Sequence, residues 1–127
     1  MSMKYDFEDY IVHYDRLYED GHIYSKDAFK SSDGLTVPIT ANHWDFCMGI
    51  AVLENREDGV VAKCIFNDAV YSRMALGALM NENGYELVFE ANEVERQGNK
   101  IVSGVITRVL YTPSEAVYHL VEEPTDA

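Results

Sequence analysis

His43 is the residue whose type and setting are best suited to chemistry. It ends an alternating, strand-like segment, Leu35-Thr-Val-Pro-Ile-Thr-Ala-Asn-His43, and a second strand-like segment begins at Met48. An imidazole titrates near neutral pH, so a histidine at a strand end beside a short loop can act as a general base. A single histidine is more often a surface or structural residue, so the role of His43 depends on its neighbours.

Cysteine and the other histidines add little chemistry. Cys47 lies close to His43 in sequence, but nothing nearby would lower the pKa of its thiol, so we expect a buried, inert cysteine. The two cysteines and four scattered histidines show no metal-ligand spacing. We therefore expect neither a metal nor a cofactor, and free thiols in a reducing cytoplasm.

The negative net charge of the chain favours some classes of binding partner and opposes others. The chain of 127 residues has 22 acidic residues against 10 Lys and Arg, which gives a net charge of −12. Such a charge opposes binding to nucleic acid and to anionic membranes, and it suits a partner with a basic face. No segment approaches the roughly 20 apolar residues that span a bilayer. Acidic residues near the start of the chain also argue against a signal peptide.

Length and periodicity predict one domain over residues 1–127, rich in strands. Apolar alternation predicts strands near residues 5–14, 35–42, 48–54, 60–66, 86–95 and 100–111. Their short connections favour antiparallel pairing. The fold class predicted from this pattern is α+β, a small antiparallel β-barrel with helices on its outside.

Two helices are predicted beside these strands. Residues 69–81 have apolar side chains at helical spacing, including Val70 and Met74, which we expect in the core, and Asp68 is a suitable N-cap. Pro113 is suited to the first turn of a C-terminal helix over residues 114–121. An acidic tail, about residues 122–127, follows it.

A resemblance to a known family covers residues 18–112. It is carried by the order of these motifs: Asp33-Gly34-x-x-Val37-Pro38-Ile39-x-x-x-His43, Gly49-x-Ala51-x-Leu53-Glu-Asn-Arg56, Gly59-Val60-x-Ala62, Phe66-Asn67-Asp68, Leu87-x-x-x-Ala91-Asn92, Gly98-Asn99 and Val102-x-Gly104-Val105-Ile106. In this order they resemble the prohead (capsid maturation) serine proteases of tailed phages, most of all those from phages of Gram-positive bacteria. The resemblance implies the barrel of herpesvirus assemblin and the trimming of scaffold and capsid proteins.

The same resemblance assigns the catalytic histidine to His43 and leaves two other positions substituted. Such a protease needs a serine nucleophile, a histidine base and a third group that orients the base. Val88 stands at the expected serine position, and Arg108 at the expected acid position. Valine cannot attack a carbonyl, and arginine cannot accept the imidazole N–H. Losing a triad nucleophile removes about 10⁶-fold in turnover, so catalysis would need a displaced nucleophile, for which Ser103 is the candidate.

Three hypotheses therefore stand. The first is a catalytically inactive phage head-morphogenesis protein that binds capsid or scaffold protein in the host cytoplasm or the virion head, with self-association through helix 69–81 left open. The second is an active maturation protease with His43 as base. The third is an unrelated β-barrel binding or regulatory domain, whose nine Tyr and five Phe line a pocket.

Overall fold

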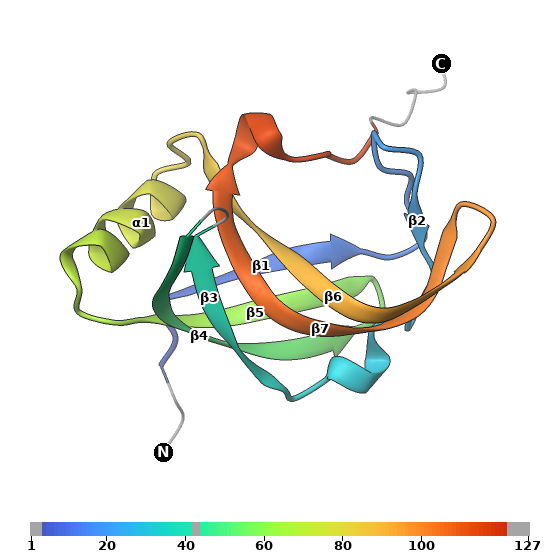
Figure 1. Cartoon of the computed structure of the whole chain (residues 1–127), viewed down its shortest axis with the longest axis horizontal. Helices are drawn as coiled ribbons and strands as arrows, with labels where there is room; N and C mark the ends of the chain where they lie inside the picture. The colour runs from blue at the N-terminus through green and yellow to red at the C-terminus, as the bar shows by residue number, and fades with distance from the viewer. Residues whose placement is uncertain (1–3, 42–43, 122–127) are drawn as a thin grey trace.

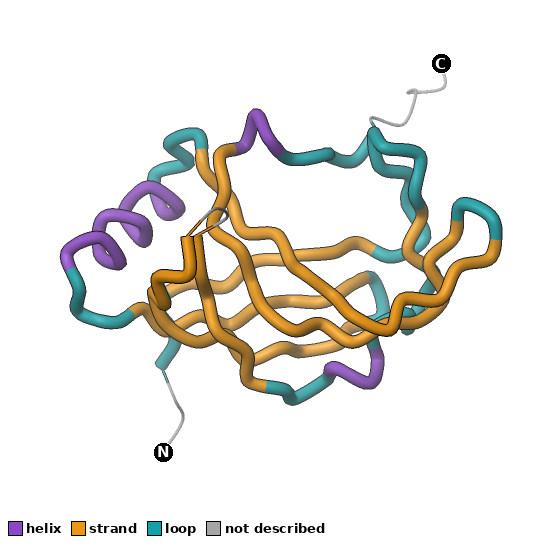
Figure 2. The backbone as a smooth tube through the Cα atoms, viewed as in Figure 1, coloured by secondary structure: helices purple, strands orange, loops and turns teal. Residues whose placement is uncertain are grey.

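The structure is a computed structural model that describes residues 4–41 and 44–121. Strands dominate it, and the described residues contain a single α-helix (Figures 1 and 2). The elements in chain order are β1 (Phe7–His13), β2 (Ile23–Tyr24), the 3₁₀ turn η1 (Lys30–Ser32), β3 (Thr36–Ala41), β4 (Trp44–Arg56), β5 (Gly59–Phe66), α1 (Val70–Met80), β6 (Tyr85–Gln97), β7 (Lys100–Pro113) and the 3₁₀ turn η2 (Ser114–Ala116).

All seven strands form one curled sheet. Its order is β1-β5-β4-β3-β7, with β6 on the other side of β7 and β2 pairing with the start of β7. The sheet curls into a half-barrel, which leaves β1 and β6 as its two edges (Figure 1). Register shifts along the β6–β7 pair, between Glu90 and Ala91, between Asn92 and Glu95 and between Glu95 and Arg96, add to this curvature.

The predicted α+β class is confirmed, but the structure differs from the predicted antiparallel barrel in two respects. The pairings of β3 and β2 with β7 are parallel. Strands separated by a long stretch of chain can pair in parallel, and β4, β5, α1 and β6 lie between β3 and β7. In the described part of the chain, no ladder joins β1 to β6, so the sheet stays open along that side.

The strands themselves were predictable from alternation. β1, β3, β4, β5, β6 and β7 confirm the six predicted strands, with β4 longer than expected. In β5 the alternate residues Ala62, Cys64 and Phe66 are all buried and form its inward face. β1 lies at an edge of the sheet.

Helix α1 is confirmed, but its predicted core face and N-cap are wrong. Val70 and Met74 are 77% and 67% exposed. The face against the sheet consists of Ser72, Ala75, Leu76 and Leu79. Small side chains at two of these positions let the helix approach the strands closely. The N-cap residue is Ala69 rather than Asp68, and its backbone N–H donates to the side chain of Asn67.

The predicted C-terminal helix over residues 114–121 is also wrong. Only η2 forms, and the chain is extended from Val117 onward. We call residues 114–121 the strap. The strap hydrogen-bonds to the segment after β1: the Val121 N–H donates to Leu17 O, and the Glu19 N–H donates to His119 O. A helix of eight residues is marginally stable by itself. The hydrogen bonds to the segment after β1 therefore stabilise the extended conformation more than helix formation would.

The core fills the concave side of the half-barrel. Its fully buried apolar side chains are Val12, Phe29, Ile39, Met48, Leu53, Val60, Cys64, Ile106 and Val109. The segment around η1 closes one end, where Phe29 contacts the rings of Tyr24 and Phe89 at 5.7 and 5.1 Å between centroids. The Ser32 hydroxyl accepts a hydrogen bond from the Ile106 N–H there, which fixes η1 against β7.

Gly59 permits the close approach of β1 and β5. A Cβ on Gly59 would lie 2.1 Å from the carbonyl oxygen of Val12, a backbone atom that cannot move away alone. Gly49 stands in the same relation to Ile65 O, at 2.0 Å. The motifs that contain these two glycines therefore have a structural reason independent of catalysis.

We predict that Gly59→Ala lowers the free energy of unfolding by about 2 kcal/mol or more, since strand β1 must shift to admit the methyl group. Gly77→Ala is the matched control, because nothing lies within 4 Å of a Cβ at this helical position. It should raise the free energy of unfolding by about 0.5–1 kcal/mol. Urea denaturation measures both changes. A Gly59→Ala protein as stable as the unmodified one would contradict the close packing.

Candidate functional site

His43, the predicted general base, lies outside the described residues. The strand before it, β3, ends at Ala41, which is opposite Tyr111 of β7. Tyr111 is in turn opposite Leu87 of β6. The end of β3 therefore shares a row of the sheet with the residue next to Val88.

Val88 and Arg108 are neighbours on the outer face of the sheet. Val88 lies opposite Leu110, and Arg108 lies opposite Glu90, two residues along both strands. Side chains alternate between the faces of a strand, so these four lie on the face opposite the buried Val109. The sheet thus brings together the positions at which the family resemblance expects a serine and an acid.

The residues at these positions provide no triad chemistry. Arg108 Nε donates to Glu90 Oε1 at 2.9 Å, so the nearby carboxylate is engaged by a guanidinium. Val88 carries neither a proton to transfer nor a lone pair. Thr40 adds a hydroxyl in the row of Leu110, but it is only 6% exposed and is closed to a substrate.

Ser103 is not brought to the end of β3. It lies opposite Glu95, eight positions along β7 from Tyr111. An extended strand of that length spans about 26 Å. Ser103 instead lines a surface pocket with Ser31 and Gly104. The geometry therefore does not favour Ser103 as a displaced nucleophile.

The two thiols have opposite settings, and the expectation that Cys47 is buried is wrong. Because side chains alternate along β4, Met48 lies in the core while Cys47 is exposed. Cys47 Sγ lies 3.4 Å from Gly49 O, its acceptor. Cys64 is fully buried, and burial raises the pKa of its thiol to about 12.

We predict that a thiol reagent at pH 8 modifies one cysteine rapidly and the other only after unfolding. Cys47 is the accessible thiol, whereas Cys64 is shielded and holds its proton because of its raised pKa. Counting the modified thiols with a chromogenic disulfide checks this. Cys47→Ser should abolish the rapid phase, and a rapid phase that survives would contradict the burial of Cys64.

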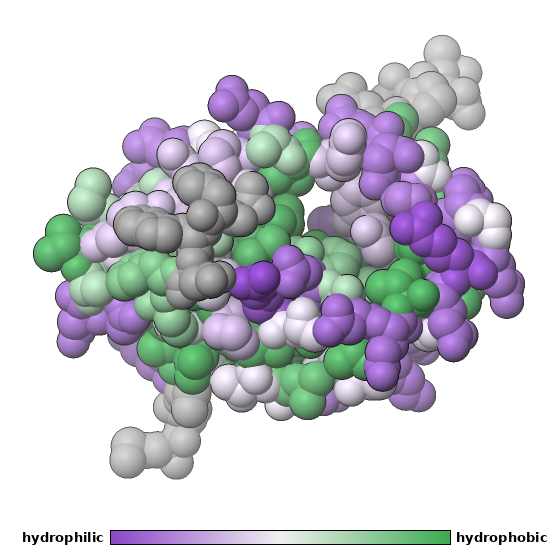
Figure 3. All heavy atoms as spheres, viewed as in Figure 1, coloured by the Kyte–Doolittle hydropathy of each residue, from purple (hydrophilic) through white to green (hydrophobic). Residues whose placement is uncertain are grey.

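An open groove runs between the edge strands β1 and β6. Three adjoining pockets of about 510, 250 and 350 Å³ make it up. They share lining residues, since Leu87 belongs to the first and third, and Ile11 and Val88 to the second and third. We call this channel the seam groove. The space-filling view shows a hollow between the strap and the strands beneath it (Figure 3).

The floor of the seam groove is apolar and its rim is acidic. Apolar and aromatic residues that line it include Ile11, Tyr18, Tyr24, Leu87, Val88, Phe89, Val117 and Tyr118. Its carboxylates are Glu8, Asp9, Asp20, Glu82 and Glu86. The described lining contains no Lys or Arg. The groove is therefore suited to a ligand that is both apolar and cationic.

His119 fastens the strap across the groove. Its Nε2 lies 2.8 Å from Glu86 Oε2 on β6, and its backbone N–H donates to Glu19 Oε1 at 2.8 Å. Tyr18 and Leu120 form a β-bridge beside it. The strap thereby joins β6 to the segment that follows β1. One wall of the seam groove is fixed by these contacts.

His13 faces the same groove from β1. Its ring stacks on Tyr10 with centroids 4.9 Å apart, and its backbone N–H donates to the Tyr18 hydroxyl. Burial, helped by the charge of Arg16, lowers the pKa of His13 below 6.5, although the carboxylate of Asp58 opposes the change. The folded protein thus favours the neutral imidazole.

We predict that His13 makes the protein less stable as the pH falls from 7.5 to 5. Since its pKa is lower in the folded protein, the unfolded chain binds the proton first, and stability is lost as the pH falls below 6.5. His13→Gln should give a shallower decrease of the unfolding free energy over this range. Urea denaturation at several pH values measures it, and equal slopes would contradict the direction of the shift.

Sequence reasoning missed the seam groove. Its walls come from β1, β6 and the strap, which lie far apart in the chain and meet only through the curl of the sheet. The available signal was the acid content of the first strand-like segment and of residues 82–86. That signal shows charge, but it does not show that the two segments face each other.

Comparison with known proteins adds no relative. No family model, curated protein or solved structure matches the chain. In the described residues, no group of three or more His, Cys, Asp or Glu could hold a metal ion. The one helix of that part of the chain is too short to cross a membrane. Function is therefore inferred from the residues, their geometry and the family resemblance.

Proposed function

We propose that the protein is a catalytically inactive phage head-morphogenesis protein that binds capsid or scaffold protein. It would act in the host cytoplasm during assembly as a structural, decorating or assembly component of the head. The observation that carries the proposal is the site around Val88. The resemblance expects a serine there, and the chain has a valine beside the Arg108–Glu90 ion pair.

The expected serine and the expected acid are both substituted, at Val88 and Arg108, and the two losses differ in their consequence for catalysis. A protease could tolerate a different third group, because triad variants exist with several orienting residues. It cannot dispense with the nucleophile, and none of Ser103, Thr40 and Cys64 takes the place of Val88. Ser103 is at the far end of β7, Thr40 is buried and Cys64 retains its proton.

The charge of the chain supports a binding role. A net charge of −12 favours association with a basic surface and raises the rate of such an encounter. It opposes nucleic acid and anionic membranes as partners. Among macromolecular partners, a protein with a basic surface suits this charge, and capsid or scaffold protein is the one that the resemblance implies.

We predict that the purified protein co-sediments with heads, or with capsid and scaffold proteins, of its phage and cleaves none of them. The cleavage assay is electrophoresis of the mixture over many hours, with His43→Ala as the control. The unmodified protein and His43→Ala should give the same bands, because both carry valine at the expected serine position, Val88. Cleavage that His43→Ala abolishes would establish the active protease instead. Failure to bind heads and both proteins would overturn the binding role.

A further inference from the structure

We propose that the seam groove binds an extended, basic segment of a partner protein. The inference rests on the proposed function in taking a protein as the partner. Beyond the proposed function, it specifies which surface binds the partner, that the bound segment is extended, and that basic and apolar side chains alternate along it.

The shape of the groove fits an extended chain. It follows residues 85–89 of β6, which corresponds to about 16 Å, or five residues of an extended segment. Ile11 and Leu87, both buried, form its floor between the two strands. Tyr118 of the strap is 65% exposed and stands at the side of the groove. An apolar side chain can therefore enter the groove while its neighbours remain at the rim.

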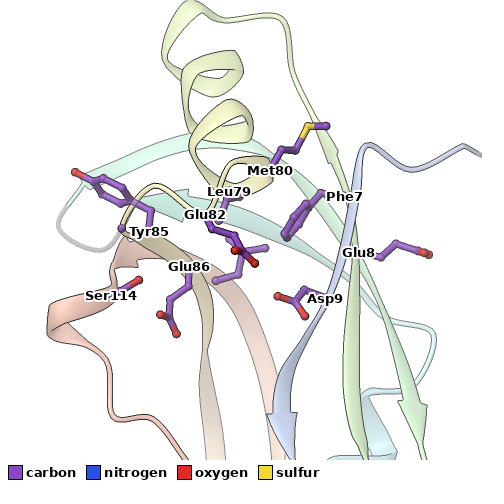
Figure 4. Close-up of a pocket in the computed structure, with 11 residues that line it drawn as sticks. Phe7, Glu8, Asp9, Leu79, Met80, Glu82, Tyr85, Glu86 and Ser114 are labelled. Atoms are coloured by element: carbon purple, nitrogen blue, oxygen red, sulfur yellow. The ribbon is translucent and has the colours of Figure 1, made fainter.

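The charge of the rim selects a cation. Two carboxylates, those of Asp9 and Glu82, point into the space between β1 and β6 (Figure 4), and that of Glu86 lies on the same rim, 2.8 Å from His119 Nε2. Glu8 lines the same pocket but points away from it (Figure 4). With no Lys or Arg in the described lining, these charges are complementary to Lys or Arg side chains of a ligand.

The charge also argues against the chain's own tail as occupant. The residues after the strap include Glu122, Glu123 and Asp126. Bringing these acids to an acidic rim would place like charges side by side, which is unfavourable. A segment from another protein, with the opposite charge, is the occupant that the rim favours.

Side chains of the partner, rather than its backbone, are what β1 can recognise. The N–H of Tyr10 donates to Asp9 Oδ1 at 2.8 Å, and the N–H of His13 donates to the Tyr18 hydroxyl at 2.9 Å. These two edge amides are already satisfied, which hinders the addition of a strand to β1. A segment in which Lys and Val alternate would place apolar side chains on the floor and ammonium groups at the rim.

The first test uses a fluorescein-labelled peptide, Lys-Val-Lys-Val-Lys-Val-Lys amide, and fluorescence anisotropy. Asp9→Lys combined with Glu82→Lys should weaken its binding at least about tenfold. Glu57→Lys combined with Glu95→Lys changes the net charge equally, at exposed positions outside the groove. This control should weaken binding by no more than about twofold. Equal losses in the two variants would overturn the groove as the binding site.

The second test separates the apolar floor from the acidic rim. A peptide with Ser in place of each Val should bind more weakly than the Lys-Val peptide, and Tyr118→Ser should weaken the Lys-Val peptide by about threefold or more. Circular dichroism confirms that each variant is folded. Amide NMR shifts on adding the peptide should cluster at Val88, Phe89 and Tyr118. Shifts confined to other surfaces would overturn the inference.

Co-sedimentation distinguishes failure of this inference from failure of the proposed function. If Asp9→Lys combined with Glu82→Lys binds heads as fully as the unmodified protein, the groove inference fails and the proposed function stands. If the Lys-Val peptide binds in the groove but the protein binds no head, capsid or scaffold protein, the inference stands and the proposed function fails. Loss of both interactions in this variant, with both retained in the Glu57→Lys, Glu95→Lys control, supports the two together.

Discussion

Two-sided pairing of β7 is the interaction on which the rest of the structure depends. This strand of fourteen residues pairs with β6 along nearly its whole length. On its other side it pairs first with β2 and then with β3, both in parallel. Without β7, no strand ladder would connect the β1-β5-β4-β3 part of the sheet to β6. The core packing of Ile106 and Val109, and the row that contains Val88, both follow from this one strand.

The open side of the sheet is the second constraint. An unpaired strand edge invites association with other chains, and proteins usually cover or blunt it. Here the side chains of Asp9 and Tyr18 satisfy two amides of β1, and the strap fills part of the space beside β6. The remaining space keeps its apolar floor and acidic rim. Protection against unselective strand pairing and selective access for a cationic segment thus come from the same residues.

Alternation and turn residues were enough to predict the strands, but the sequence pattern did not predict contacts between distant segments. β5 could be predicted from its continuous run of apolar and β-branched residues, whose burial alternates from Ala62 to Phe66. The faces of α1 could not, since Val70 and Met74 have the same helical spacing as the residues that actually face the sheet. The strap was misread as a helix, because its partners lie about 100 positions away. For the site, the substitution at Val88 stays a prediction from the resemblance, whereas the groove could be seen only once the curl of the sheet brought β1 and β6 together.

The strap also determines at which stage of synthesis and folding the seam groove can form. The bond between the His119 N–H and Glu19 Oε1 joins residues 100 positions apart. Contacts of such separation carry a large loop-closure cost, so they form after the local hairpins. During synthesis, β1 leaves the ribosome well before β7 and the strap that complete its surroundings. A nascent chain therefore has no seam groove, and a partner can be bound there only by a chain whose translation has reached the strap.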